Sequence, residues 1–209
     1  MTDIGVTPEL ETAERILHEA AALFRTKSFN GASMQALATA VGITKSSLYH
    51  HYPSKQALLA AIVEVTMSRV PPLVAEIAAL DLPAASRLHR AIALHTAESI
   101  RERDYLACFL EESRYLSPAF MAVHRQKKDR YEALFQQLIE DGIESGEFVA
   151  QDSSLASMAV LGMCAGVIRR YQPEDGYSPD DIATAFANTA IRGLGAHDLE
   201  QIQAGEVAH

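Results

Sequence analysis

The 209-residue sequence contains no tryptophan and only two cysteines, Cys108 and Cys164. The cysteines lie far apart and neither belongs to a C-x-x-C pair, so the sequence argues against a disulfide framework and against a zinc ribbon. We expect both to be small buried residues on helices. Nothing in the sequence calls for a metal or another cofactor.

Long apolar runs are also missing. We find no uninterrupted run of about 18 apolar residues, so we expect no transmembrane helix. The first ten residues, MTDIGVTPEL, lack the basic-then-apolar pattern of a signal peptide. From these absences we expect a cytoplasmic protein that does not enter a membrane.

Motifs of common enzyme classes are absent as well. The sequence has no G-x-S-x-G, H-E-x-x-H, P-loop or G-x-G-x-x-G. His89 and His95 are six positions apart, which does not place them on one helical face as a pair of metal ligands. A nucleophilic Cys108 assisted by His95 or His124 is the one enzymatic arrangement left, and no motif supports it. We therefore predict that the protein is not an enzyme.

Strand-like alternation is absent, and helix-forming residues dominate, so the sequence predicts an all-α fold. Three short helices come first, broken at the turn beginning with Ser28, at Gly42 and at Pro53. Ser33 and Thr44 stand where helix N-caps are expected. A larger helical domain follows, with capped starts expected at Ser117, at Asp152 or Ser153, and at Ser178.

Carboxylates are missing from one part of an otherwise acidic chain. The formal net charge is −9, yet residues 20–63 contain four basic residues and no Asp or Glu. Within them, VGITKSSLYHHYPSKQAL (residues 41–58) is rich in hydroxyl groups. A positive, acid-free segment favours contact with a polyanion.

The same segment has the pattern of a helix-turn-helix, two short helices joined by a turn that contains Gly42. In the second helix, Leu48 and Tyr52 are four apart and are expected to face inward. Lys45 and Tyr49 are expected on the outer side. In such units the second helix enters the major groove of DNA.

Residues 15–62 resemble the DNA-binding domain of the tetracycline-repressor (TetR) family. The resemblance is carried by Phe24, Ser33, Met34, Ala38, Gly42, Ile43, Thr44, Leu48, Tyr49, His51, Tyr52, Ser54, Lys55 and Leu58. It implies an N-terminal three-helix helix-turn-helix domain followed by a larger helical domain that binds a ligand and dimerises. Ser28 and Ser46 depart from the glycine of many relatives, and Ala32 from threonine, so the operator sequence does not carry over.

The resemblance also implies roles for individual residues on this surface. Phosphate contacts are expected from Ser33, Ser47, Tyr49, His51 and Lys55. Base-edge contacts are expected from Lys45 and Ser46, beside the helix-capping Thr44, with Tyr49 and His50 close by. For His50, base contact and simple solvent exposure are equally good interpretations.

The expected domains are a helix-turn-helix domain at 10–56, a connecting region at 57–80, a ligand-binding and dimerisation domain at 81–196, and a tail at 197–209. Helices near 153–171 and 179–194 are apolar and rich in small residues, which suits a two-fold dimer interface, although an intramolecular core is the alternative. A homodimer on double-stranded DNA with a small-molecule effector is the implied assembly.

The C-terminal half is similar to a branch of the family that senses acyl-CoA thioesters, although that branch often has a tryptophan where this chain has none. Candidate ligand-binding residues are Tyr105, Phe109, Tyr115, Phe120, His124, Tyr131, Arg169, Arg170 and Tyr171. Plain core packing is the alternative for the aromatic residues, and an exposed helix end is the alternative for the arginines. A ligand-binding helical protein without DNA binding and a small helical enzyme are the competing functions.

Overall fold

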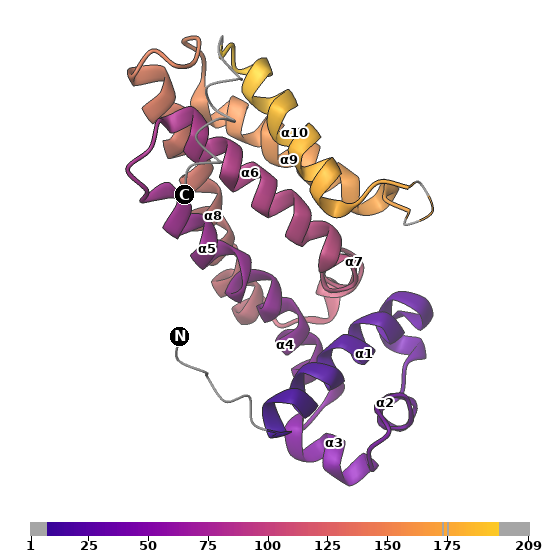
Figure 1. The fold of residues 1–209 in the computed structure, drawn as a ribbon. Coiled ribbons are helices and arrows are strands. Elements are labelled where there is room, and N and C mark those ends of the chain that lie inside the picture. The colour runs from indigo at the N-terminus through magenta and orange to yellow at the C-terminus, as the bar shows by residue number, and fades with distance from the viewer. Residues whose placement is uncertain (1–7, 173, 175, 197–209) are drawn as a thin grey trace. The chain divides into compact units, whose positions relative to one another are not determined.

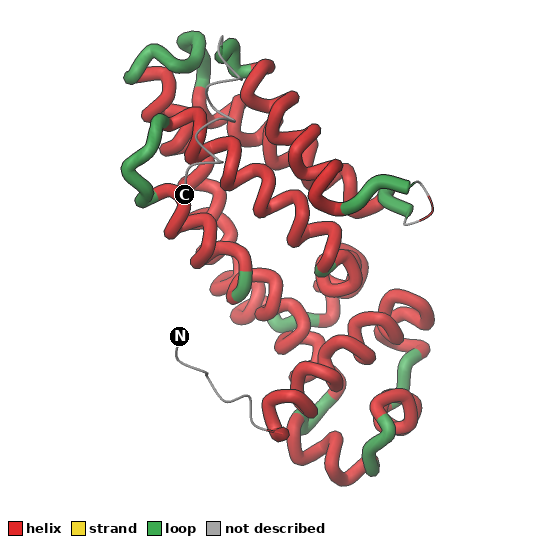
Figure 2. Tube along the Cα trace, in the orientation of Figure 1, coloured by secondary structure: helices red, strands yellow, loops and turns green. Residues whose placement is uncertain are grey.

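The computed structural model describes residues 8–172, 174 and 176–196, and every regular element within these ranges is a helix (Figures 1 and 2). The predicted all-α fold class is thereby confirmed. The elements are α1 (Pro8–Gly31), α2 (Met34–Val41), α3 (Lys45–His51), α4 (Lys55–Ser68), α5 (Val70–Ala78), α6 (Ala84–Arg101), α7 (Arg103–Glu112), the 3₁₀ helix η1 (Ser113–Tyr115), α8 (Pro118–Glu144), α9 (Ser153–Arg170) and α10 (Pro179–Gly193). The expected tail, 197–209, lies outside the described residues.

The chain forms two compact units. The first unit contains the residues up to Thr66 together with Asp104–His124, and the second contains Met67–Arg103 and the residues from Arg125 onward. The segment 104–124, expected within the ligand-binding domain, therefore packs with the helix-turn-helix. The predicted domain boundaries themselves remain a proposal.

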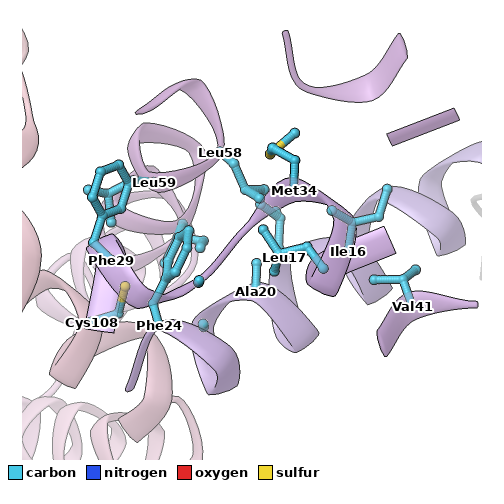
Figure 3. Close-up of a cluster of buried hydrophobic side chains, with 14 of the residues drawn as sticks. Ile16, Leu17, Ala20, Phe24, Phe29, Met34, Val41, Leu58, Leu59 and Cys108 are labelled. Carbon is cyan, nitrogen blue, oxygen red and sulfur yellow. The ribbon is translucent and has the colours of Figure 1, made fainter. Parts of the chain in front are cut away.

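The core of the first unit is built from the apolar faces of α1 to α4 and is completed by α7 (Figure 3). Phe24, Leu37 and Leu48 are fully buried, as their spacing along one face of each helix predicts. Tyr105 and Cys108 from α7 pack into the same cluster. Burying these apolar surfaces against one another fixes α2 and α3 on a common support.

Local signals set the ends of the short helices, as predicted. The Ser33 hydroxyl accepts a hydrogen bond from the Ala36 amide (3.1 Å), and the Thr44 hydroxyl accepts one from the Ser47 amide (3.1 Å). Gly42 ends α2 in the left-handed region at φ 77°, a conformation that glycine adopts at little cost. The Ser54 hydroxyl caps α4 through the Ala57 amide (3.0 Å).

The helical pattern of α1 continues to Gly31 rather than ending before Ser28. The break expected at Ser28 is nevertheless present, because Ser28 has φ 60° and ψ 163°, which are not helical angles. Positive φ is uncommon for a residue with a Cβ atom. Residues 29–31 therefore form a separate last turn, tilted away from the body of α1.

In the second unit, α6 packs against α10, α5 and α9. The core contains Leu88 and Ile92 from α6, Phe135 from α8, Cys164 from α9 and Ile191 from α10. The predicted caps are present: Asp152 caps α9, and Ser178 with Asp181 forms a reciprocal capping box on α10. Ser117 also caps α8, through the amide of Phe120. Cys108 and Cys164 are both buried free thiols, as expected.

One stretch of the described residues, Lys55–Ala78 across α4 and α5, is long and apolar enough to cross a membrane, with a mean hydropathy of 1.5 over its most apolar window. Pro71 and Pro72 are the second and third residues of α5. Leu58, Leu59 and Ile62 are fully buried in the core of the first unit. Core helices of globular proteins have the same composition, so the stretch is weak support for a membrane span.

Candidate nucleic-acid interface

The second helix of the helix-turn-helix, α3, is fixed from its inner side and open on its outer side. Leu48 is fully buried, and Tyr52 is half-buried against the core of the first unit. The amide of Tyr52 donates to the Leu48 carbonyl and ends the helix. The two inward-facing residues predicted from the sequence thus hold α3 in place.

Most of the predicted DNA-contacting side chains are accessible. The exposed residues are Ser33, Thr44, Lys45, Ser46, Tyr49 and His50, and the half-buried residues are Ser47, His51 and Lys55. Tyr49 keeps 42% of its surface exposed although it is a large aromatic residue. The Lys45 ammonium lies 5.9 Å from the centre of the Tyr49 ring, so the two side chains occupy the same outer face.

Four of these residues meet at one place. Ser33, Lys45, Tyr49 and Lys55 line a shallow, open hollow of about 540 Å³ between the start of α2, α3 and the start of α4. Residues 20–63 contribute no carboxylate to this face. The exposed N-termini of α2 and α3 present backbone N–H groups and the positive ends of their helix dipoles. Hydroxyl, ammonium and amide donors of this kind suit the oxygen atoms of a phosphate backbone.

Lys55 has a second set of partners that sequence reasoning missed. Its Nζ donates to the carbonyl oxygen of Phe29 (2.6 Å) and to that of Ala32 (2.9 Å), and it lies 4.4 Å from the centre of the Phe29 ring. An ammonium group has three donors, so two of them already serve the fold. No local pattern reveals these carbonyl groups, because they lie 23 and 26 positions away along the chain.

The candidate ligand residues fall into two groups. Tyr105, Phe109, Tyr115 and Phe120 pack on the core of the first unit. His124 is buried beside Phe109, with ring centres 4.6 Å apart. Tyr131, Arg169, Arg170 and Tyr171 belong to the second unit. Their role in ligand binding remains a prediction.

In the second unit, Tyr131 is buried and its hydroxyl is 2.8 Å from Nδ1 of His95. Burial lowers the pKa of His95 to about 4, so the ring is neutral at pH 7. Burial also raises the pKa of Tyr131. Sequence reasoning considered His95 only as a metal ligand or a catalytic base and missed this pair. The pair is a hydrogen-bonding group inside an apolar bundle.

At the end of α9, Arg170 is exposed, and Tyr171 caps the helix while its ring lies 5.7 Å from the guanidinium carbon of Arg103. The side chain of Arg169 lies outside the described part of the structure. The described residues contain no group of three or more His, Cys, Asp or Glu side chains arranged to hold a metal ion.

Two family descriptions match most of the chain. Residues 16–62 match "Bacterial regulatory proteins, tetR family", and residues 81–194 match "Tetracyclin repressor-like, C-terminal domain". The HTH-type transcriptional regulator UidR of Escherichia coli K12 is 27% identical over 180 residues, which cover 84% of this chain and 89% of UidR.

Solved structures show the same fold. The regulator PfmR from Thermus thermophilus has a TM-score of 0.80 and 29% identity, covering 86% of this chain and 98% of PfmR. AibR, solved in complex with isovaleryl coenzyme A and operator DNA, has a TM-score of 0.74 and 23% identity, covering 85% of this chain and 97% of AibR.

Proposed function

The chain belongs to the tetR family of bacterial regulatory proteins, and from this premise we propose that it is a homodimeric repressor that a small molecule releases from a palindromic operator. It is a DNA-binding transcriptional regulator and not an enzyme. A helical ligand-binding protein without DNA activity is no longer favoured. We assign DNA binding to residues 10–56, connection to 57–80, and ligand binding and dimerisation to 81–196, in a cytoplasmic protein.

One observation carries the DNA-binding assignment: Ser33, Lys45, Tyr49 and Lys55 line one hollow on a face without carboxylates. We place α3 in the major groove, where Lys45, Ser46 and His50 read base edges. Backbone phosphates are then contacted by the donors around it, namely Ser33, Thr44, Ser47, Tyr49 and His51. Lys55 contributes its one remaining donor.

Dimerisation is supported by the surface of α9. Leu155 and Met158 on α9 keep 59% and 65% of their surfaces exposed. Gly162 and Gly166 are also exposed, and an added Cβ at either position would meet no atom within 4 Å. Exposed apolar and small residues on one helix suit close packing against a second copy.

For the effector we propose an acyl-CoA thioester. The support is the similarity of the C-terminal half to thioester-sensing relatives and the isovaleryl coenzyme A bound in AibR. The exposed Arg170 beside Tyr171 offers a guanidinium for phosphate groups. Inside the bundle, the Tyr131–His95 pair offers a hydrogen bond to a carbonyl oxygen. A thermal-shift series with acyl-CoAs of increasing chain length tests this, and stabilisation only by compounds that are not CoA esters contradicts it.

The DNA assignment is tested by a salt titration of duplex binding, monitored by fluorescence anisotropy. We expect Tyr49→Ala to weaken binding to all duplexes, because a positioning contact to phosphate is lost. We expect Lys45→Ala to weaken binding, reduce the slope of log affinity against log salt by about one, and change base preference. Wild-type affinity and slope in both variants would remove α3 from the interface.

A further inference from the structure

A residue outside the helix-turn-helix forms a hydrogen bond to the turn between α1 and α2. After the break at Ser28, Phe29 is 3% exposed, and Figure 3 shows its ring beside Phe24 and Leu59 in the core of the first unit. Its backbone amide donates a buried hydrogen bond to Oε1 of Glu112 on α7 (2.9 Å). Phe29 and Glu112 are 83 positions apart in the sequence.

The same residue is held from its other side by Lys55. The Phe29 carbonyl accepts from Lys55 Nζ, and Lys55 Nζ also reaches the carbonyl of Ala32, the residue before the cap of α2. A carboxylate and an ammonium group therefore hold the N–H and the C=O of one residue. Hydrogen bonds to charged partners are about twice as strong as those between neutral groups.

A second set of contacts connects the turn to the segment that follows α7. The side-chain amide of Asn30 donates to the hydroxyl of Tyr115 in η1 (2.8 Å). The Tyr115 ring stacks on the ring of Phe29, with centres 4.7 Å apart and planes 22° apart. The turn thus contacts α7 and η1 through one charged hydrogen bond, one neutral hydrogen bond and one aromatic stack.

Burying the Glu112 carboxylate at this position is energetically unfavourable. Glu112 is only 2% exposed, and burying a carboxylate costs free energy unless hydrogen bonds or charges compensate. Arg114 forms an ion pair with Glu112, with Nη2 3.7 Å from Oε2. An apolar residue would fill the site without that cost but would leave the Phe29 amide without its acceptor. The carboxylate is therefore suited to fixing the turn in one position.

We propose that Glu112 is a positioning residue for DNA binding, which acts through Phe29 on the proposed operator-binding surface. The turn leads directly into Ser33 at the start of α2, and Lys55 stands at the start of α4. Both residues line the hollow with Lys45 and Tyr49. Binding sites need their contact groups held within about 0.5 Å by supporting residues. Operator affinity thus depends on α7, outside the helix-turn-helix.

The inference rests on the proposed function, because the position of this turn affects affinity only if α2 and α3 form the DNA-binding surface.

The test measures operator affinity, affinity for unrelated DNA, and melting temperature for three variants and one control. Glu112→Leu removes the acceptor and the charge, whereas Glu112→Gln keeps an acceptor oxygen. Tyr115→Phe keeps the stack and removes only the hydroxyl. Glu111→Gln, at the exposed neighbouring position on α7, is the matched control.

We expect Glu112→Leu to lower operator affinity at least about tenfold, the equivalent of one lost hydrogen bond to a charged group, in a protein that still melts cooperatively. Glu112→Gln should recover affinity to within about threefold, Tyr115→Phe should lose about threefold, and Glu111→Gln should match wild type. Hydrogen exchange at the Phe29 amide should accelerate in Glu112→Leu and not in Glu112→Gln.

Wild-type operator affinity in a folded Glu112→Leu variant would overturn the inference. If that variant does not fold, wild-type operator affinity in Tyr115→Phe, together with wild-type operator affinity in a Glu112→Gln variant whose Phe29 amide exchanges faster, shows that the turn can loosen without affecting DNA binding and also overturns the inference. Failure of the wild-type protein to bind any duplex would instead contradict the proposed function, so the two failures are distinguishable.

Discussion

At the scale of single residues, Lys55 has two candidate roles, one in DNA binding and one in the stability of the fold. The sequence alone does not distinguish them. The family resemblance implies a phosphate contact, whereas the structure shows Nζ donating to the carbonyls of Phe29 and Ala32. We expect Lys55→Ala to lower the free energy of unfolding by about 2 kcal/mol, because two buried acceptors lose a charged donor. Urea unfolding measures this, with Lys27→Ala at an exposed position as the control.

The stability and the salt slope of Lys55→Ala together decide which role Lys55 has. A Lys55→Ala variant with unchanged stability and a salt slope reduced by about one would place the ammonium on DNA rather than in the fold. Reduced stability with little change in slope would make Lys55 mainly a structural residue.

The lowered pKa of His95 predicts that the stability of the fold depends on pH. Its pKa is lowered from 6.5 to about 4 by burial, so between these pH values the unfolded chain binds a proton that the folded chain does not. Stability therefore falls as pH drops from about 6.5 to 4, by about 3 kcal/mol at most. His95→Gln should remove this component of the pH dependence, as measured by urea unfolding at pH 7, 5.5 and 4.5.

The exposed His18 provides the control for this measurement. A His18→Gln variant should keep the wild-type pH dependence. If His95→Gln keeps it too, His95 is protonated in the folded protein, and the neutral His95–Tyr131 pair is wrong.

At the scale of elements, the turn between α2 and α3 depends on one glycine. Gly42 has φ +77°, and an added Cβ would meet no atom within 4 Å, so a side chain there costs backbone strain and not a clash. We expect Gly42→Ala to destabilise the fold by about 1 kcal/mol. Gly31→Ala, at the end of α1, should be neutral or stabilising, because φ is not positive there and an added Cβ would make only ordinary contacts at 3.7 Å with Lys27 and Ser28. Equal effects in thermal unfolding would contradict the conformational argument.

The element scale also shows what could be predicted from sequence. The caps at Ser33, Thr44 and Ser178 were predictable because a cap joins residues two or three positions apart. The Glu112–Phe29 hydrogen bond was not, since it depends on how α7 packs in three dimensions. The same reason explains why the contacts of Tyr115 with the turn between α1 and α2 were not predictable.

At the scale of the whole molecule, the exposed apolar face of α9 predicts the assembly. We expect Met158→Asp to convert a dimer into monomers, because a charge would be buried at the interface. Sedimentation equilibrium measures the change. Val123→Asp on α8, a position with a similar exposed fraction of 54%, should leave the assembly unchanged. A monomeric wild-type protein, or a dimeric Met158→Asp variant, would remove α9 from the proposed interface.

The central claim is that two copies of α3 read one palindromic operator. Selection of bound duplexes from a randomised pool by the full-length protein tests it most directly. The account predicts enrichment of an inverted repeat whose half-sites are centred about 34–36 Å apart, or a multiple of that distance, with Lys45→Ala selecting a different base. Enrichment of no repeated sequence, or an identical preference in Lys45→Ala, would contradict the assignment of α3 as the reading helix.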